Sequence, residues 1–121
     1  MDQSDDRFEQ GCRHFDAGEY FEAHEVWEDL WNEAGGDRHA YLQGLIQAAV
    51  ALHHAGNANW NGARKLVASS LGYLEKGRSA AKEVDVGALR NHLLDLELYI
   101  QGRVAGRDEV LPQFKLPRQG G

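Results

Sequence analysis

The 121-residue sequence predicts an all-α fold, a compact bundle of about five helices packed as repeat-like helix hairpins. Apolar residues recur at intervals of three and four along five segments, which is the spacing of one helix face. Only two prolines are present, so few positions interrupt a helix. No segment shows the period-two alternation of a strand. We expect one domain over residues 1–121, with its helical core at about 5–106 and an extended tail at 107–121.

The first two predicted helices form a short hairpin. Phe8, Cys12 and Phe15 fall on one face of the first helix, and Gly18 suits the left-handed residue that ends it. The second helix begins at Tyr20, and its apolar residues lie three and four positions apart. These residues are Tyr20, Ala23, Trp27, Leu30 and Trp31. We expect this face to point into the bundle and the opposite, acidic face to point outward.

The third predicted helix, about residues 38–55, is apolar nearly all round. Its polar exceptions are Gln43, Gln47 and His54, which share one stripe at spacings of four and seven. Asp37 precedes the helix and is expected to cap its first turn by accepting backbone N–H groups. The apolar composition predicts a helix at the middle of the bundle.

Two more helices are predicted at about 60–76 and 86–105. An aromatic-x-x-Ala pattern at Trp60 repeats the one at Tyr20, which is typical of helix-hairpin repeats where a large ring fills the space over a small residue. Two interior glycines, one of them Gly72, weaken the first of these helices intrinsically. We expect close packing against other helices to hold it.

The C-terminal tail is expected to be extended, because Pro112 and Pro117 interrupt any helix there. Its apolar residues, from Leu111 to Leu116, are expected to lie over a groove of the bundle. Residues 118–121 carry no apolar anchor, so we expect them to be loose.

Composition limits the possible partners. A net charge of -6 argues against general binding to nucleic acid or anionic lipid, because phosphate contacts need clustered Lys and Arg. The longest apolar stretch, residues 45–52, is far short of the roughly 20 residues that span a bilayer. Cys12 is the single cysteine, so it forms no internal disulfide, which favours a reducing compartment. We therefore expect a cytoplasmic protein with neither a nucleic-acid nor a membrane partner.

Charge is distributed unevenly along the chain. Residues 14–37 contain eight acidic side chains and no Lys or Arg, whereas eight basic ones lie within 64–107. One interpretation is a set of solvated faces that keep a monomer in solution. The other is complementarity, either to a protein partner or between the two copies of a homodimer.

The most distinctive local pattern is H-E-x-x-E, which begins at His24. The zinc-protease pattern H-E-x-x-H needs a second imidazole one turn away, and here Glu28 takes that position. In the first interpretation His24 belongs to a structural polar cluster, satisfied by Glu28 or by Gln43 and Gln47 of the third helix. Such a cluster would fix the register of the two helices. Another interpretation is that the same residues line a pocket for a small ligand.

The alternative is a metal site. His24 and Glu28 are four residues apart and point the same way on a helix, which provides two ligands. His53 or His54 of the third helix, or Glu25 at the edge, would supply the rest. This alternative predicts a divalent metal, whereas the first interpretation predicts no cofactor.

Nothing in the sequence indicates an activated nucleophile. Cys12 lies on an apolar helix face and is expected to be a buried, inert thiol. Ser69 and Ser70 lie within a helix without an adjacent base. The chain therefore favours a binding or interaction module with a structural His/Glu/Gln cluster over an enzyme, and the metal-dependent enzyme remains the alternative.

Two long motifs resemble a known family. They are E-A-H-E-V-W-E-D-L-W at residues 22–31 and Y-L-Q-G-L-I-Q-A-A at residues 41–49. Together they resemble the bacterial and archaeal family catalogued as domain of unknown function 309, over about residues 8–74. The resemblance implies a small all-α bundle and assigns no activity. It also implies that the motif residues form the signature of the fold: Glu22, His24, Glu25, Trp27, Glu28, Trp31, Gln43 and Gln47.

Overall fold

The computed structural model describes residues 5–120 and confirms the predicted all-α bundle. Its elements are α1 (Arg7–Asp16), α2 (Tyr20–Glu33), α3 (Gly36–Gly56), α4 (Trp60–Lys76), the short 3₁₀ helix η1 (Arg78–Ala80) and α5 (Val86–Val104). Over residues 5–120 no strand forms, and β-type pairing is limited to one isolated bridge between Val84 and Arg118. No helix in that range has the length and apolarity needed to cross a membrane.

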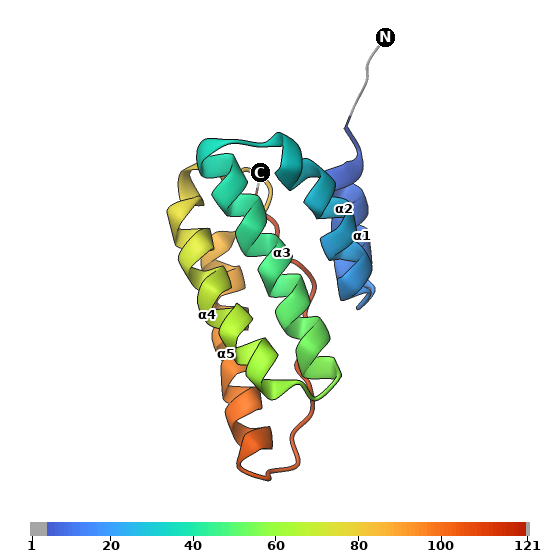
Figure 1. The fold of residues 1–121 in the computed structure, drawn as a ribbon, viewed down its shortest axis with the longest axis vertical. Helices are drawn as coiled ribbons and strands as arrows, with labels where there is room; N and C mark the ends of the chain where they lie inside the picture. The colour runs from blue at the N-terminus through green and yellow to red at the C-terminus, as the bar shows by residue number, and fades with distance from the viewer. Residues whose placement is uncertain (1–4, 121) are drawn as a thin grey trace.

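Helix α3 lies at the centre of the molecule. Figure 1 shows α1 and α2 on one side of it and α4 and α5 on the other. Ala48, Ala49 and Ala51 of α3 are fully buried, and such small side chains let neighbouring helices approach closely. Gly44 marks one such close approach, because a Cβ added there would lie 2.7 Å from the side chain of Leu74 in α4. The nearly uniform apolar surface of α3 is therefore explained by burial on several sides.

The α1–α2 hairpin is closed by an aromatic cluster. Trp27 is fully buried, and its indole Nε1–H donates to the carbonyl oxygen of Phe8 at 3.1 Å. The rings of Phe8 and Phe15 each lie 6.0 Å from the Trp27 ring. Gly11 of α1 contacts the indole face, where any side chain would overlap the ring. Trp27 thus fixes the distance between the two helices.

The repeat-like pattern is visible in the packing. Ala23 of α2 and Ala63 of α4 are both fully buried, each three residues after an aromatic residue that begins its helix. Tyr20 packs edge-on against Phe15, and Trp60 packs edge-on against the ring of Tyr99. In both hairpins a large ring lies beside a small buried residue.

The predicted cap of α3 is wrong. The helix begins at Gly36, so Asp37 lies inside its first turn, and the Asp37 carboxylate accepts a hydrogen bond from the Ser79 hydroxyl at 2.6 Å. This carboxylate ties α3 to the segment that follows α4. Helix α4, by contrast, begins with a side-chain cap, since Asn59 Oδ1 accepts from the backbone N–H of Gly62 at 3.1 Å.

A polar network joins α3 to the α4–α5 connection. The Arg38 guanidinium lies over the rings of Phe8 and Tyr41 and donates two hydrogen bonds, of 2.9 and 2.8 Å, to the Glu83 carboxylate. The Tyr41 hydroxyl donates to the same carboxylate at 3.2 Å and accepts from the backbone N–H of Val84. The four polar groups of this half-buried network, the Arg38 guanidinium, the Glu83 carboxylate, the Tyr41 hydroxyl and the Val84 N–H, therefore satisfy one another.

The C-terminal tail runs back along the bundle beside α1 and α5 (Figure 1). Leu116 is 3% exposed, and its backbone N–H donates to the Asp16 carboxylate at 2.7 Å. The ring of Phe114 stacks on His92 at 4.2 Å and also contacts Phe15 at 5.9 Å. The tail therefore closes the apolar groove between α1 and α5.

The expectation that residues 118–121 are loose is wrong for the two residues that begin this segment. Arg118 forms a two-bonded ion pair with Glu9, at 3.1 and 2.7 Å. The backbone N–H of Gln119 donates to the Glu83 carbonyl oxygen at 2.9 Å. Residues 1–4 and 121 lie outside the described part of the chain.

Candidate binding site

His24 finds its polar contacts within its own helix. Its Nδ1 lies 2.9 Å from the carbonyl oxygen of Phe21, an atom that only accepts, so this bond requires the proton on Nδ1. Its Nε2 lies 3.7 Å from the Glu28 carboxylate, one turn further along α2. The His24 side chain is 17% exposed and that of Glu28 is 53% exposed. The pair is therefore at the edge of the bundle, and Glu25 is exposed beside it.

His53 and His54 lie at the C-terminal end of α3. The His53 ring contacts the exposed Phe21 ring at 5.4 Å. Asn57 and Asn59 hold the two imidazoles, with amide nitrogens 3.3 Å from His53 Nε2 and 3.3 Å from His54 Nδ1. These residues belong to the turn after α3, so the histidines serve the connection to α4.

The alternative interpretation required His24, Glu28 and an α3 histidine to form a metal cluster, and within residues 5–120 they do not form one. Among residues 5–120, no three His, Cys, Asp or Glu side chains gather in an arrangement that holds a metal ion. His24 and Glu28 remain two adjacent donors without a third.

Gln43 and Gln47 lie on the α2-facing side of α3. Two ring contacts fix the antiparallel order of these helices: Trp31 stacks on His39 at 4.4 Å, and Phe21 contacts His53 further along. Both glutamines fall between these contacts and are half-buried. The Gln47 Oε1 and Trp31 Nε1 atoms are buried, and neither has a hydrogen-bond partner within the described chain. The polar stripe is thus present between the helices, but His24 forms its hydrogen bond with Phe21.

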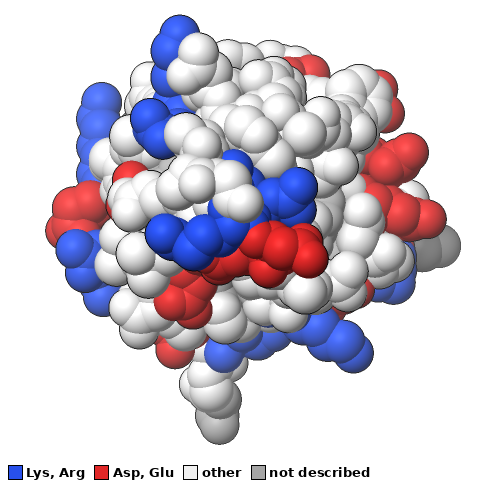
Figure 2. Space-filling view, turned by 90° about the horizontal axis from the view of Figure 1, so that it is seen from below, with Lys and Arg blue, Asp and Glu red and all other residues white. Residues whose placement is uncertain are grey.

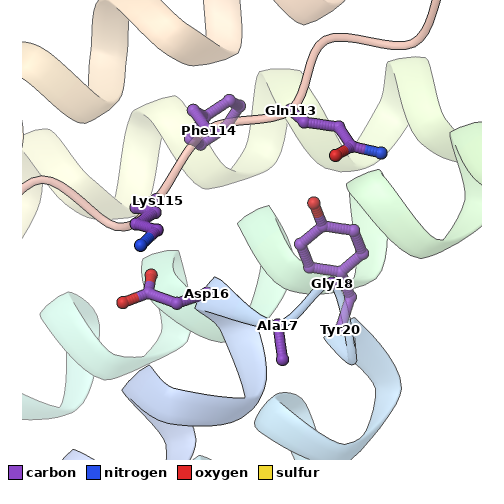
Figure 3. A pocket seen from close by; sticks show the side chains of 7 residues that line it. All are labelled: Asp16, Ala17, Gly18, Tyr20, Gln113, Phe114 and Lys115. Carbon is purple, nitrogen blue, oxygen red and sulfur yellow. The ribbon is translucent and has the colours of Figure 1, made fainter.

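A concave surface lies elsewhere, beside the tail. A hollow of about 330 Å³ lies between the α1–α2 turn and the tail. Figure 3 shows the residues that line it: Asp16, Ala17, Gly18, Tyr20, Gln113, Phe114 and Lys115. A second hollow of about 250 Å³ shares part of this lining and extends to the end of α3, lined by Gly18, Tyr20, Leu52, His53, Gly56, Asn57, Leu111 and Gln113. We call the two hollows together the tail groove. His53 is the one predicted site residue in its wall.

Tyr20 and Gln113 stand where the two hollows meet. Figure 3 shows the Tyr20 hydroxyl directed toward the Gln113 side chain, and the Asp16 carboxylate directed toward Lys115. Burial, with a smaller contribution from the Asp16 charge, raises the pKa of Tyr20 above its ordinary value. The hydroxyl is therefore protonated at neutral pH, so it can both donate and accept a hydrogen bond.

The main chain of the tail beside this groove has groups that are unpaired within residues 5–120. In the described chain, no hydrogen bond engages the backbone N–H or carbonyl groups of residues 111–115. Side chains alternate along the segment, with Leu116 and Phe114 turned inward and Lys115 and Gln113 exposed, which is the geometry of an extended strand. The tail is therefore an unpaired strand-like edge.

Sequence reasoning did not identify this groove, because its walls come from segments about 100 residues apart. The signals for it were the glycine turn before Tyr20 and the proline-bounded apolar tail. The end of the molecule seen in Figure 2 carries positive and negative side chains interspersed with uncharged surface. The segregation of charge along the sequence does not produce a field of one sign on this face.

Comparison with known proteins relates the N-terminal half to a family. Residues 8–66 match the family model described as "Domain of unknown function (DUF309)". Over residues 8–66 the chain is therefore similar to the DUF309 family. The resemblance predicted from the motifs is therefore confirmed. "Uncharacterized protein YpuF" from Bacillus subtilis (strain 168) is 39% identical over 79 residues, which is 64% of this chain and 44% of that protein. The chain thus matches less than half of this relative's length.

The DUF309 segment provides only part of the tail groove. It contains α1, α2, α3 and the first residues of α4, and therefore includes Tyr20 and His53. The opposite wall, from Leu111 to Lys115, lies outside it. The groove therefore has one wall from the matched segment and the other from residues that follow it.

Proposed function

We propose that this protein is a binding module and that its tail groove takes an extended peptide segment of a partner protein. The observation that carries the proposal is the strand-like edge of residues 111–115, whose main-chain groups have no partner within the described chain. An exposed edge of this kind binds a peptide by adding a strand to it. Main-chain hydrogen bonds then provide affinity, and the hollows beside the edge provide specificity.

The chemistry of the groove suits such a peptide. The hollows, at about 330 and 250 Å³, are large enough for two or three side chains. Tyr20 and Phe114 present aromatic surface, and the Tyr20 hydroxyl and Gln113 amide add groups that donate and accept hydrogen bonds. Asp16 and Lys115 place one charge of each sign at one end. We expect a peptide with an apolar side chain flanked by polar residues.

The partner is proposed to be a protein in a reducing, cytoplasmic environment, and not a nucleic acid. The net charge of -6 supports the choice of partner. The burial of the single Cys12, at 2% exposure, supports the compartment, since the fold uses this thiol as an apolar side chain.

The metal-dependent alternative rests on His24 and Glu28 alone. No observation adds a third ligand, so it is a hypothesis without a specific structural argument. Elemental analysis of purified protein tests it, with His24→Ala as the comparison. Stoichiometric metal in the parent that is lost in the variant would establish it.

The peptide proposal is tested by replacing each of two matched alanines with phenylalanine. Ala17 and Ala105 are both exposed C-cap residues with nearly the same backbone conformation, at φ -86°, ψ 1° and φ -78°, ψ 1°. Ala17 lines the tail groove and Ala105 does not. Ala17→Phe fills the groove, whereas Ala105→Phe adds the same ring elsewhere.

The probe is a random twelve-residue peptide library displayed on phage and selected against the parent protein. Selected peptides are expected to bind Ala17→Phe at least about tenfold more weakly than the parent, and Ala105→Phe equally well. A selection that yields no binder, or binders that Ala17→Phe does not weaken, would overturn the proposal.

A further inference from the structure

The outward face of α4 contains a glycine that the monomer does not explain. A Cβ added at Gly44 or Gly11 would meet Leu74 or Trp27, so those glycines are required by close packing. A Cβ added at Gly72 would meet nothing within 4 Å. Gly72 nevertheless lies within α4, where glycine lowers helix stability relative to alanine by about 1 kcal/mol. The packing that the sequence predicts for this glycine is therefore not found inside the monomer.

Gly72 belongs to a shallow apolar surface. Ala68, Ser69, Gly72, Tyr73 and Lys76 line a hollow of about 240 Å³ on α4, and the Tyr73 ring borders it at 37% exposure. The opposite side of the helix is buried against the rest of the bundle. This surface, which we call the α4 face, consequently has no partner within the described chain.

We propose that the α4 face binds the same face of a second copy of the chain, with the two α4 helices antiparallel. In a two-fold arrangement whose axis lies level with Ser70 along α4, residues equally distant from Ser70 in the sequence oppose each other, while Ser70 itself is buried on the opposite side of the helix. Ala68 then opposes Gly72 of the second copy, so the two backbones can approach closely where neither has a large side chain.

In this antiparallel arrangement, the charged residues on either side of the Ala68–Gly72 contact are complementary between the two copies. Lys65 and Glu75 are each five residues from Ser70, so the antiparallel pair brings Lys65 of each copy beside Glu75 of the other. Both side chains are exposed, and the contact of Glu75 within the monomer is a 3.5 Å approach to Arg78. Two symmetric ion pairs then flank the small-residue centre, which favours this occupant over an unrelated apolar helix.

Two residues of the same charge, Arg64 and Lys76, are also equally distant from Ser70 in the sequence. Arg64 and Lys76 are twelve residues apart, so their directions differ by about a third of a turn. The side-chain directions of Lys65 and Glu75 around the α4 axis differ by less, about 80°, and those of Ala68 and Gly72 differ by about 40°. The like charges therefore lie on opposite flanks of the contact, where water separates them.

Gly72→Ala gives opposite effects on folding and association. The added methyl group raises helix propensity and has free space in the monomer, so the variant is expected to unfold at a higher urea concentration than the parent. The same methyl group keeps the two helices apart, so sedimentation velocity is expected to show weaker association. A gain in stability together with unchanged association would contradict the proposal.

A charge exchange tests the register. Lys65→Glu and Glu75→Lys each place like charges together twice and are expected to weaken self-association at least about tenfold. The double variant K65E/E75K restores opposite charges and is expected to associate like the parent. Arg90→Glu makes the same charge change on α5 and serves as the control.

The measurement is sedimentation velocity over a range from about 1 to 500 μM, a span suited to the weak affinity of a single-helix contact. A parent that stays monomeric throughout, or a Lys65→Glu variant that behaves like Arg90→Glu, would overturn the proposal. Ala17→Phe leaves the α4 face intact, so this result is independent of the tail groove.

Discussion

Glu83 is the residue whose replacement most directly tests how burial determines the strength of an ion pair. Its carboxylate accepts two hydrogen bonds from Arg38 and one from the Tyr41 hydroxyl. The side chains of Arg38 and Glu83 are 33% and 24% exposed. Glu83→Ala leaves the guanidinium half-buried without its carboxylate and leaves the Tyr41 hydroxyl without an acceptor.

The expected loss follows from this partial burial. Removing one partner of a fully buried ion pair lowers the free energy of unfolding by about 3–5 kcal/mol, and hydrogen bonds to charged groups are individually worth about 1.5–3 kcal/mol. Because both side chains are about one-quarter to one-third exposed, solvent recovers part of this energy. We expect Glu83→Ala to lower the free energy of unfolding by about 2–3 kcal/mol.

A second Arg–Glu pair provides the control. Arg7 binds Glu33 with two hydrogen bonds of 2.8 and 2.9 Å, the same two-bonded geometry, but the Glu33 side chain is 64% exposed. Glu33→Ala is expected to change stability far less, because water and salt screen an exposed pair. Urea unfolding followed by circular dichroism measures both variants. Equal losses for Glu83→Ala and Glu33→Ala would refute the dependence on burial.

The same carboxylate makes stability depend on pH. Burial alone raises the pKa of Glu83, but the hydrogen bonds and charge of Arg38, with the Tyr41 hydroxyl, lower it below its ordinary value of 4.5. A lowered pKa in the folded protein means that the stabilisation is present above 4.5 and is lost as the pH falls through the folded-state pKa. Glu83→Gln is therefore expected to flatten the loss of stability between about pH 5 and pH 3. A parent and variant with parallel acid profiles would contradict this linkage.

Three further predictions concern the packed core. Gly11→Ala is expected to lower the free energy of unfolding by about 1–3 kcal/mol in urea titrations, because the methyl group would overlap the buried Trp27 ring; an unchanged or higher value would show that the ring moves freely. Leu116→Ala is expected to lower it by about 2–5 kcal/mol, since this tail residue is 3% exposed, and a loss near zero would mean that the tail is not docked. Burial raises the pKa of the Cys12 thiol to about 12, so a disulfide reagent at about pH 8 is expected to label Cys12 only as fast as the protein opens; labelling as fast as in urea would contradict its burial.

Local sequence pattern predicted the helices well because the signals that define them are local. Apolar spacing and terminal glycines placed the third, fourth and fifth helices within two residues of their observed bounds. Asp37 shows where local reasoning fails. Its position before an apolar run is typical of a cap, but Ser79, 42 residues away, determines its contact. A hydrogen bond between such distant residues has no signature in either neighbourhood.

For the candidate site, too, the contacts within one helix were predictable from the sequence, and the contacts between helices were not. The proximity of His24 to Glu28 follows from their spacing on one helix, and the structure places them 3.7 Å apart. The link from His24 to α3 required the relative rotation of two helices, which spacing does not determine. Glu83 lies in a connection with no periodic pattern, so its role beneath Arg38 had no local signal.

The two proposed binding surfaces depend on residues outside the DUF309 segment. That segment ends at residue 66, whereas the strand-like edge of the tail groove is formed by residues 111–115 and the α4 face is centred on residues 68–72. The segment itself supplies the aromatic core around Trp27 and one wall of the groove. Both proposals therefore combine residues of the matched segment with residues that follow it. A partner found for one member is therefore expected to bind another only when the second wall of the groove has the same chemistry.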